Sequence, residues 1–152
     1  TAILFGYNRM GKHVYEQMNL VSEDCLIVDF NPSVIVQLAD DGIASMYGDA
    51  GSDDVLRFIH AEKAKLIVST IPDATVNVDL LDYLKQHRSR AIIVVTVRRA
   101  EEAEKCYAMG ASYVIIPSVL GGEAFGQYLK TQKLKRGGWD ALAKRHRKNA
   151  GI

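Results

Sequence analysis

Short runs of aliphatic and β-branched residues alternate with helix-like segments along this chain, and this alternation limits the possible fold more than any other feature. Six such runs occur. They are Ala2–Phe5, Leu26–Asp29, Ala44–Tyr47, Leu66–Thr70, Ile92–Val97 and Tyr113–Ile116. Most are continuously apolar, which is typical of strands buried on both faces of a parallel sheet. The sequence therefore predicts an α/β fold: a Rossmann-like, doubly wound, six-stranded parallel sheet with right-handed crossovers and a C-terminal helical extension.

Cap and turn residues mark the helices between these runs. Asn31 precedes Pro32 and is suited to cap the second helix, and Gly42 can end that helix in the left-handed conformation. Ser52 is expected to cap the third helix, and Gly110 to follow the fifth. These signals support a series of consecutive β–α units.

The alternation stops after Pro117. We therefore divide the chain into a Rossmann-type domain, residues 1–117, and a second part, residues 118–152, with one helix and a basic helical tail. The expected pieces of the second part are a connection at Leu120-Gly121-Gly122, a helix over Glu123–Lys130, a break at Gly137-Gly138 and a short helix over Trp139–Arg147.

Composition narrows the class of protein. A chain of 152 residues that is 48% hydrophobic suits one packed domain. No apolar run approaches the roughly 18 residues that span a bilayer, and no signal peptide is visible. Because the chain opens almost directly on a strand, we expect it to be a piece of a longer protein. Cys25 and Cys106 form no pair or cluster of the metal-binding kind, so no metal is predicted.

The formal net charge of +1 gives no general attraction to nucleic acid or to membranes. The stretch Lys144–Lys148 is basic and can add affinity for phosphates or anionic lipid. It lacks the interleaved aromatic residues that stack on bases. A solvated helix is the better interpretation, and no nucleic-acid partner is predicted.

A glycine-containing turn between the first strand and the first helix carries the main functional signal. It reads Gly6-Tyr7-Asn8-Arg9-Met10-Gly11. In a dinucleotide-binding fingerprint the amides at this helix N-terminus hold a phosphate. Asn8 stands where the middle glycine is usual, so we expect the ligand to sit differently or to be a mononucleotide. The alternative is that Gly6 and Gly11 only serve a tight turn.

The second strand ends in Asp29, 18 residues past Gly11. An acid at about this spacing accepts hydrogen bonds from ribose hydroxyls, and its charge would repel a 2′-phosphate. The alternative is that Asp29 caps the strand end. The turn and the acid together favour an adenine nucleotide, with NADP disfavoured.

Three further polar residues follow later strands at the edge where ligands bind in this architecture. Asp49 can meet the adenine amino group or cap the next helix. Thr70 can bind a phosphate or a ribose. Arg98 can neutralise a phosphate or be a solvated surface residue. Asp73 is better explained as a helix cap.

Residues for catalysis are not apparent. The four histidines belong to no visible dyad, and no nucleophile elbow, Walker lysine or HExxH motif occurs. We therefore predict no catalytic residues and a protein that is not an enzyme. The alternative is a fragment of an NAD-dependent oxidoreductase, whose substrate-binding part would lie elsewhere.

The turn, Val28-Asp29, Tyr47–Ala50, Thr70–Asp73 and Ala111–Pro117 resemble, in this order, the RCK N-terminal domain, also called KTN or TrkA-N. The resemblance covers roughly residues 2 to 130 and is strongest to the versions at the C-terminus of potassium-efflux-type cation:proton antiporters. It departs at Asn8, where the family usually has glycine.

That resemblance implies a regulatory domain at the cytoplasmic face of the cell membrane, which gates a potassium channel or cation:proton antiporter. The implied ligand is AMP, ATP or NAD(H). The implied partners are a membrane transport domain and a second copy, and Leu120–Lys130 matches the family's crossover helix, which commonly packs on a partner subunit. Phe125, Tyr128 and Leu129 are apolar candidates for that contact; the alternative is that they pack within the chain. The nucleotide site would comprise Gly6, Tyr7, Asn8, Arg9, Met10, Gly11, Asp29, Phe30, Asn31, Asp49, Ala50, Thr70, Ile71, Pro72 and Arg98.

Overall fold

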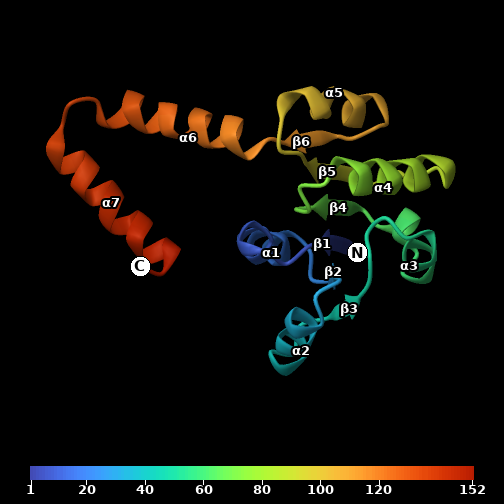
Figure 1. Ribbon diagram of the computed structural model, residues 1–152. Helices are drawn as coiled ribbons and strands as arrows, with labels where there is room; N and C mark the ends of the chain where they lie inside the picture. Colours follow the sequence, from blue (N-terminus) through green and yellow to red (C-terminus); the bar gives the residue numbers. More distant parts are fainter. The chain divides into compact units, whose positions relative to one another are not determined.

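Six parallel strands form one sheet in the order β3-β2-β1-β4-β5-β6 in the computed structural model, which describes residues 1–152 (Figure 1). The strands are β1 (Ala2–Phe5), β2 (Cys25–Asp29), β3 (Ser45–Tyr47), β4 (Leu66–Ser69), β5 (Ile92–Thr96) and β6 (Tyr113–Ile115). This is the strand order of the doubly wound nucleotide-binding fold. The predicted fold class is confirmed, with each strand within a residue of its expected start and end.

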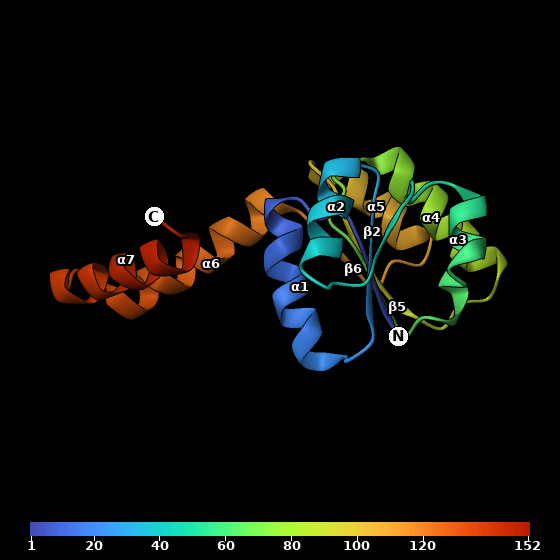
Figure 2. The same cartoon turned by 90° about the horizontal axis from the view of Figure 1, so that it is seen from below.

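Helices connect the strands on both faces of the sheet. They are α1 (Arg9–Val21), α2 (Pro32–Asp40), α3 (Asp53–Phe58), α4 (Ala74–Gln86) and α5 (Ala100–Ala108), with a 3-10 turn at Ala61–Lys63. Figure 2, which views the sheet nearly edge-on, shows α1 on one side and α3 and α4 on the other.

The alternation of side chains along β1 divides the core in two. Ile3 and Phe5 join one buried cluster with residues of α3, α4 and α5, whereas Ala2 and Leu4 join the other with Met18 of α1. Period-two alternation within a strand buried on both faces requires this split. β1 is therefore the centre of the core as well as the strand that leads into the turn.

Several helix ends follow their local sequence signals. The Asn31 side chain accepts the Ser33 amide at 3.1 Å and caps α2, with Pro32 at its first position. Gly42 and Gly110 follow α2 and α5 with φ angles of +71° and +104°. Ser52 stands at the N-cap of α3 but its side chain makes no capping hydrogen bond.

The segment after β6 differs from the sequence prediction. α6 spans Pro117–Gln132, so Gly121 and Gly122 lie inside a helix and not in a connection before one. Pro117 at the first helical position favours this earlier start, because its fixed φ suits the first turn. α7 spans Arg136–Ala150, so Gly137 and Gly138 also begin a helix.

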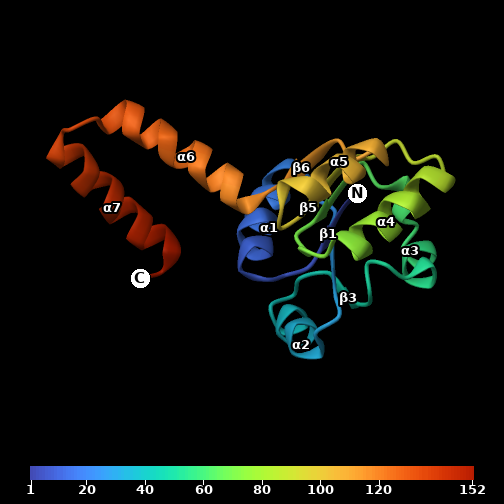
Figure 3. The same ribbon diagram turned by 45° about the horizontal axis from the view of Figure 1, so that its top comes forward.

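The actual break lies at residues 133–135, between α6 and α7 (Figure 3). Lys133 adopts a left-handed φ of +50°, and the Trp139 indole donates to its carbonyl at 2.9 Å. The Phe125 and Trp139 ring centroids lie 5.8 Å apart, which packs the two helices together. The position of the break between α6 and α7 therefore depends on the side-chain contacts of Trp139, which the local glycine content does not reveal.

The chain consists of two compact units, Thr1–Pro117 and Ser118–Ile152. None of its helices combines the length and the apolar character that crossing a bilayer requires.

Candidate functional site

The turn at Gly6–Gly11 lies where β1 and β4 stand side by side and the strand order reverses direction. Ligands of open α/β sheets bind outside the carboxyl ends of the strands at this switch point. Gly6 has a φ of +88°, and a Cβ there would come within 2.9 Å of the Thr70 hydroxyl. A Cβ at Gly11 would collide with the Gly6 carbonyl. Gly6 is thus required by its positive φ and the nearby Thr70 side chain, and Gly11 by the close approach of the Gly6 backbone.

Asn8 is the N-cap of α1 and bridges the turn to the end of β4. Its Oδ1 accepts the Gly11 amide at 2.8 Å, and its Nδ2 donates to the Thr70 carbonyl at 3.1 Å. The Thr70 hydroxyl donates in turn to the Gly6 carbonyl at 2.7 Å. Because Thr70 is only 1% exposed, a direct bond from its hydroxyl to a ligand would require that hydroxyl to leave Gly6.

Asp29 ends β2 beside the turn. Its Oδ2 accepts the Tyr7 amide at 2.7 Å, and its Oδ1 accepts the Asn31 amide at 2.8 Å. Each carboxylate oxygen retains a lone pair with which it can accept a further hydrogen bond. The carboxylate therefore supports the local backbone and still presents acceptors to a ribose.

Two cavities lie along this edge of the sheet. The smaller, about 280 Å³, is lined by Gly6, Tyr7, Asn8, Asp29, Phe30, Asn31, Val34, Ile71 and Pro72. The larger, about 640 Å³, is lined by Phe30, Tyr47, Gly48, Asp49, Ser52, Val55, Ile71, Pro72, Asp73, Val76 and Arg98. Phe30, Ile71 and Pro72 line both, so the two hollows adjoin. The larger volume is in the range of small-molecule sites.

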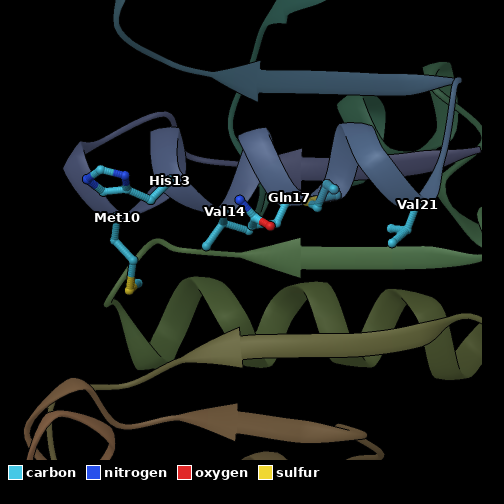
Figure 4. A pocket seen from close by; sticks show the side chains of 6 residues that line it. Met10, His13, Val14, Gln17 and Val21 are labelled. Atoms are coloured by element: carbon cyan, nitrogen blue, oxygen red, sulfur yellow. The ribbon is translucent and has the colours of Figure 1, made fainter. Parts of the chain in front are cut away.

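Most predicted site residues line these cavities, but five do not. Gly11, Ala50 and Thr70 are buried behind the turn and edge, and Arg9 is exposed. Met10 lines a different hollow of about 630 Å³ along α1, with His13, Val14, Gln17, Met18 and Val21 (Figure 4). Helical periodicity turns Met10 to that side, because residues 10, 14, 17, 18 and 21 share one face of α1.

The charged side chains of the larger cavity have distinct roles. Asp73 caps α4, accepting the Thr75 and Val76 amides at 2.9 and 3.2 Å. Asp49 accepts the Gly51 amide at 2.8 Å and is not the N-cap of α3, which is Ser52. The Arg98 side chain forms no ion pair in the structure, so its guanidinium is available to a phosphate or carboxylate.

Aromatic side chains border both hollows. Phe30 is 64% exposed, although it follows a buried strand, and it stands where the cavities adjoin. Burial raises the pKa of the Tyr7 phenol, and nearby Tyr15 and Glu16 add to the effect. Tyr7 therefore stays a neutral hydroxyl at physiological pH, and Phe30 offers a face on which a base can stack.

Sequence reasoning missed several cavity residues. Tyr47, Val55 and Val76 line the larger hollow from β3, α3 and α4. Tyr47 lies two residues before the predicted site residue Asp49, and this nearness in the sequence could have indicated it. Val55 and Val76 look like ordinary core positions. None of the four histidines lines either cavity at this edge.

Comparison with known proteins places this geometry in a family. The sequence model of the TrkA-N domain matches residues 2–117. Potassium channel protein 1 of Methanocaldococcus jannaschii is 27% identical over 122 residues, which are 79% of this chain and 37% of that protein. The glutathione-regulated potassium-efflux protein KefC of Escherichia coli is 27% identical over 96 residues, 63% of this chain and 16% of KefC. The chain thus spans well under half of these relatives.

Solved structures share the fold. The TrkA-N domain of the inner membrane protein YbaL of Escherichia coli superposes with a TM-score of 0.77 at 20% identity, covering 84% of this chain and 95% of that one. The Kef C-terminal domain of Shewanella denitrificans, in an AMP-bound form, gives 0.72 at 21% identity, covering 98% and 94%. The GsuK channel bound to NAD gives 0.66 at 18% identity, covering 76% and 21%.

Proposed function

The chain belongs to the TrkA-N domain family, and we propose that it is a regulatory domain that binds an adenine nucleotide and so gates a potassium channel or cation:proton antiporter. The observation that carries the proposal is the pair of adjoining cavities at the β1–β4 switch point, the smaller of which is lined by Asp29 and by Gly6, Tyr7 and Asn8 of the turn. The curated relatives include potassium channels and a potassium-efflux protein, and the structural relatives include AMP-bound and NAD-bound forms.

In the proposed complex, different parts of the nucleotide would lie in different cavities. The base would occupy the larger hollow, against Phe30 and within reach of the Asp49 carboxylate. The ribose hydroxyls would donate to the remaining lone pairs of Asp29, and the phosphate would lie at the turn. Arg98, which also lines the larger hollow, would offset phosphate charge.

Regulation requires the nucleotide to bind one arrangement of the protein better than another. A second copy of this chain is the proposed partner in such arrangements. No residue of α6 is buried, and five of its apolar side chains are 41–51% exposed: Val119, Leu120, Phe125, Tyr128 and Leu129. A helix with this much exposed apolar surface is typical of an interface.

The distribution of charge along the chain favours a second copy as the partner that covers the exposed apolar side chains of α6. Residues 118–152 contain eight Lys or Arg and two Asp or Glu, whereas residues 1–117 contain eleven and sixteen. The basic helical part of one copy would therefore be attracted to the acidic sheet domain of another. The hollow along α1, with exposed Val21 at its end, is an apolar recess on that acidic domain (Figure 4).

In the whole protein this domain would act at the cytoplasmic face of the membrane, on a transport domain of the same or a partner chain. The test is calorimetric titration with AMP, ADP, ATP, NAD⁺ and NADH, followed by transport assays of the intact transporter with each ligand that binds. Binding together with a change in transport supports the proposal. No binding, or binding without any change in transport, contradicts it, and substrate-dependent oxidation of NADH would favour an oxidoreductase instead.

A further inference from the structure

We infer that Asn8 makes the site selective for an adenine mononucleotide over a dinucleotide, by closing the route that a pyrophosphate would take across the switch point. The inference rests on the proposed nucleotide function and assigns the residue that sets the ligand class.

Asn8 lies at the boundary that a dinucleotide would cross. A dinucleotide lies across the switch point, with one nucleotide over each half of the sheet and the pyrophosphate at the turn. In this chain the halves are β1-β2-β3 and β4-β5-β6, and they meet where β1 pairs with β4. Asn8 reaches from the turn after β1 to the Thr70 carbonyl after β4, so its side chain spans the boundary between the halves.

The fingerprint has glycine at this position so that the backbone can approach the pyrophosphate closely. An asparagine adds four heavy atoms in that place. Both ends of its amide are hydrogen-bonded, to the Gly11 amide at 2.8 Å and the Thr70 carbonyl at 3.1 Å. Rotating the side chain away would break both bonds and leave a partly buried donor and acceptor without partners, which is unfavourable.

The same bridge leaves the first half of the site intact. The cavities that would hold the base and ribose adjoin at Phe30, Ile71 and Pro72, and Asn8 lines only the smaller one. The first four amides of a helix have no partner within it. Asn8 accepts the amide of Gly11, the third residue of α1, and the amides of Arg9 and Met10 remain for one phosphate group. A single nucleoside phosphate can therefore bind beside the bridge, whereas a pyrophosphate that crossed the turn would have to displace it.

The experiment compares AMP and NAD⁺ on the whole chain by calorimetry, in the wild-type protein and in two variants. Asn8→Gly removes the bridge and restores the usual fingerprint. Asn8→Ser keeps a capping oxygen for α1 but is too short to reach Thr70, so it tests the bridge if the glycine variant folds poorly. Asn19→Ser, the same substitution at an exposed position of α1, is the control.

We expect wild-type protein to bind AMP about tenfold or more tightly than NAD⁺, the equivalent of at least one hydrogen bond lost in opening the bridge. In both Asn8 variants the ratio of the two dissociation constants should fall about tenfold, mainly through tighter NAD⁺ binding, while Asn19→Ser leaves it unchanged. If both ligands bind and the Asn8 variants do not alter the ratio of the two dissociation constants, the inference is overturned. The proposed function would still stand. Absence of binding by AMP and NAD⁺ alike would instead overturn the proposed function, and this inference with it.

Discussion

The carboxylate of Asp29 accepts the backbone amide of Tyr7 at 2.7 Å, which fixes the end of β2 to the turn after β1. One side chain thereby sets the position of the turn and, in the proposed site, receives the ribose. The two roles can be separated, because one is a property of the free protein and the other appears only with nucleotide.

Asp29→Ala should weaken binding of AMP by about 1.5–3 kcal/mol, the scale of a hydrogen bond to a charged group. The measurement is calorimetry, with denaturant unfolding of the nucleotide-free protein to check that the fold persists. Asp24→Ala is the matched control, because that carboxylate bonds the Thr1 hydroxyl at the opposite end of β2. Unchanged affinity in Asp29→Ala would mean that the ribose lies elsewhere.

Thr70→Val should lower the free energy of unfolding by about 1–3 kcal/mol, because the buried Gly6 carbonyl loses its donor while side-chain volume is kept. Urea unfolding monitored by circular dichroism measures the change. Thr70→Ser restores the hydroxyl and should recover most of the loss. A valine variant as stable as wild type would show that this bond does not support the turn.

Two glycine-to-alanine changes should have opposite signs. Gly11→Ala forces a Cβ against the Gly6 carbonyl and should destabilise the fold by roughly 1–3 kcal/mol, the usual range for overpacking. Gly121→Ala adds a Cβ in open space inside α6 and should stabilise that helix by about 0.5–1 kcal/mol. Thermal unfolding followed by far-ultraviolet circular dichroism tests both. Equal effects would contradict the geometry at Gly11.

Phe125→Glu and Leu129→Glu should dissociate the proposed homodimer by placing charge on its apolar surface. Sedimentation equilibrium measures the association, which should also weaken as salt screens the attraction between basic and acidic parts. Leu134→Glu is the control, since Leu134 is fully exposed in the connection between α6 and α7. A wild-type protein that is monomeric at all concentrations would refute this partner.

Alkaline pH should reduce stability through buried Cys106. Burial raises the pKa of this thiol, with a further contribution from Glu102, so the folded state holds the proton that the unfolded chain releases. Below about pH 8.5, where an unperturbed thiol is protonated, Cys106 contributes no pH dependence. Above that value the free energy of unfolding should fall as pH rises, and Cys106→Ala should flatten this slope. An equal slope in the variant would assign the effect to other groups, such as Tyr83, whose pKa burial also raises.

The sheet was predictable because its strands are buried on both faces and therefore read as uninterrupted apolar runs, as in β1 and β4. The α2 boundaries were equally clear, because Asn31, Pro32 and Gly42 act locally. The α6 and α7 boundaries were not. Glycine pairs indicate a break by local propensity, but the contact of Trp139 with the Lys133 carbonyl, six residues away, places the corner elsewhere.

The candidate site was likewise predictable only in part. The turn and Asp29 follow a spacing that can be read from the sequence, and Asp29 lines the smaller cavity together with Gly6, Tyr7 and Asn8 of the turn. The hydrogen bond from Asn8 to Thr70 joins residues 62 apart, and no local pattern indicates it. Val55 and Val76 were missed because an apolar residue that borders a cavity has the same sequence signature as one in the core.

The hydrogen bonds that organise the turn are made between groups of the chain itself: Asn8 with Gly11 and Thr70, and Asp29 with Tyr7 and Asn31. A preorganised site loses little conformational entropy when it is filled, so most of the contact energy is expressed as affinity. A rigid pocket also samples few conformations. In such a site, the ligand's own exposed surface and the exposed Phe30 side chain are the surfaces through which a bound nucleotide would favour one arrangement of the protein over another.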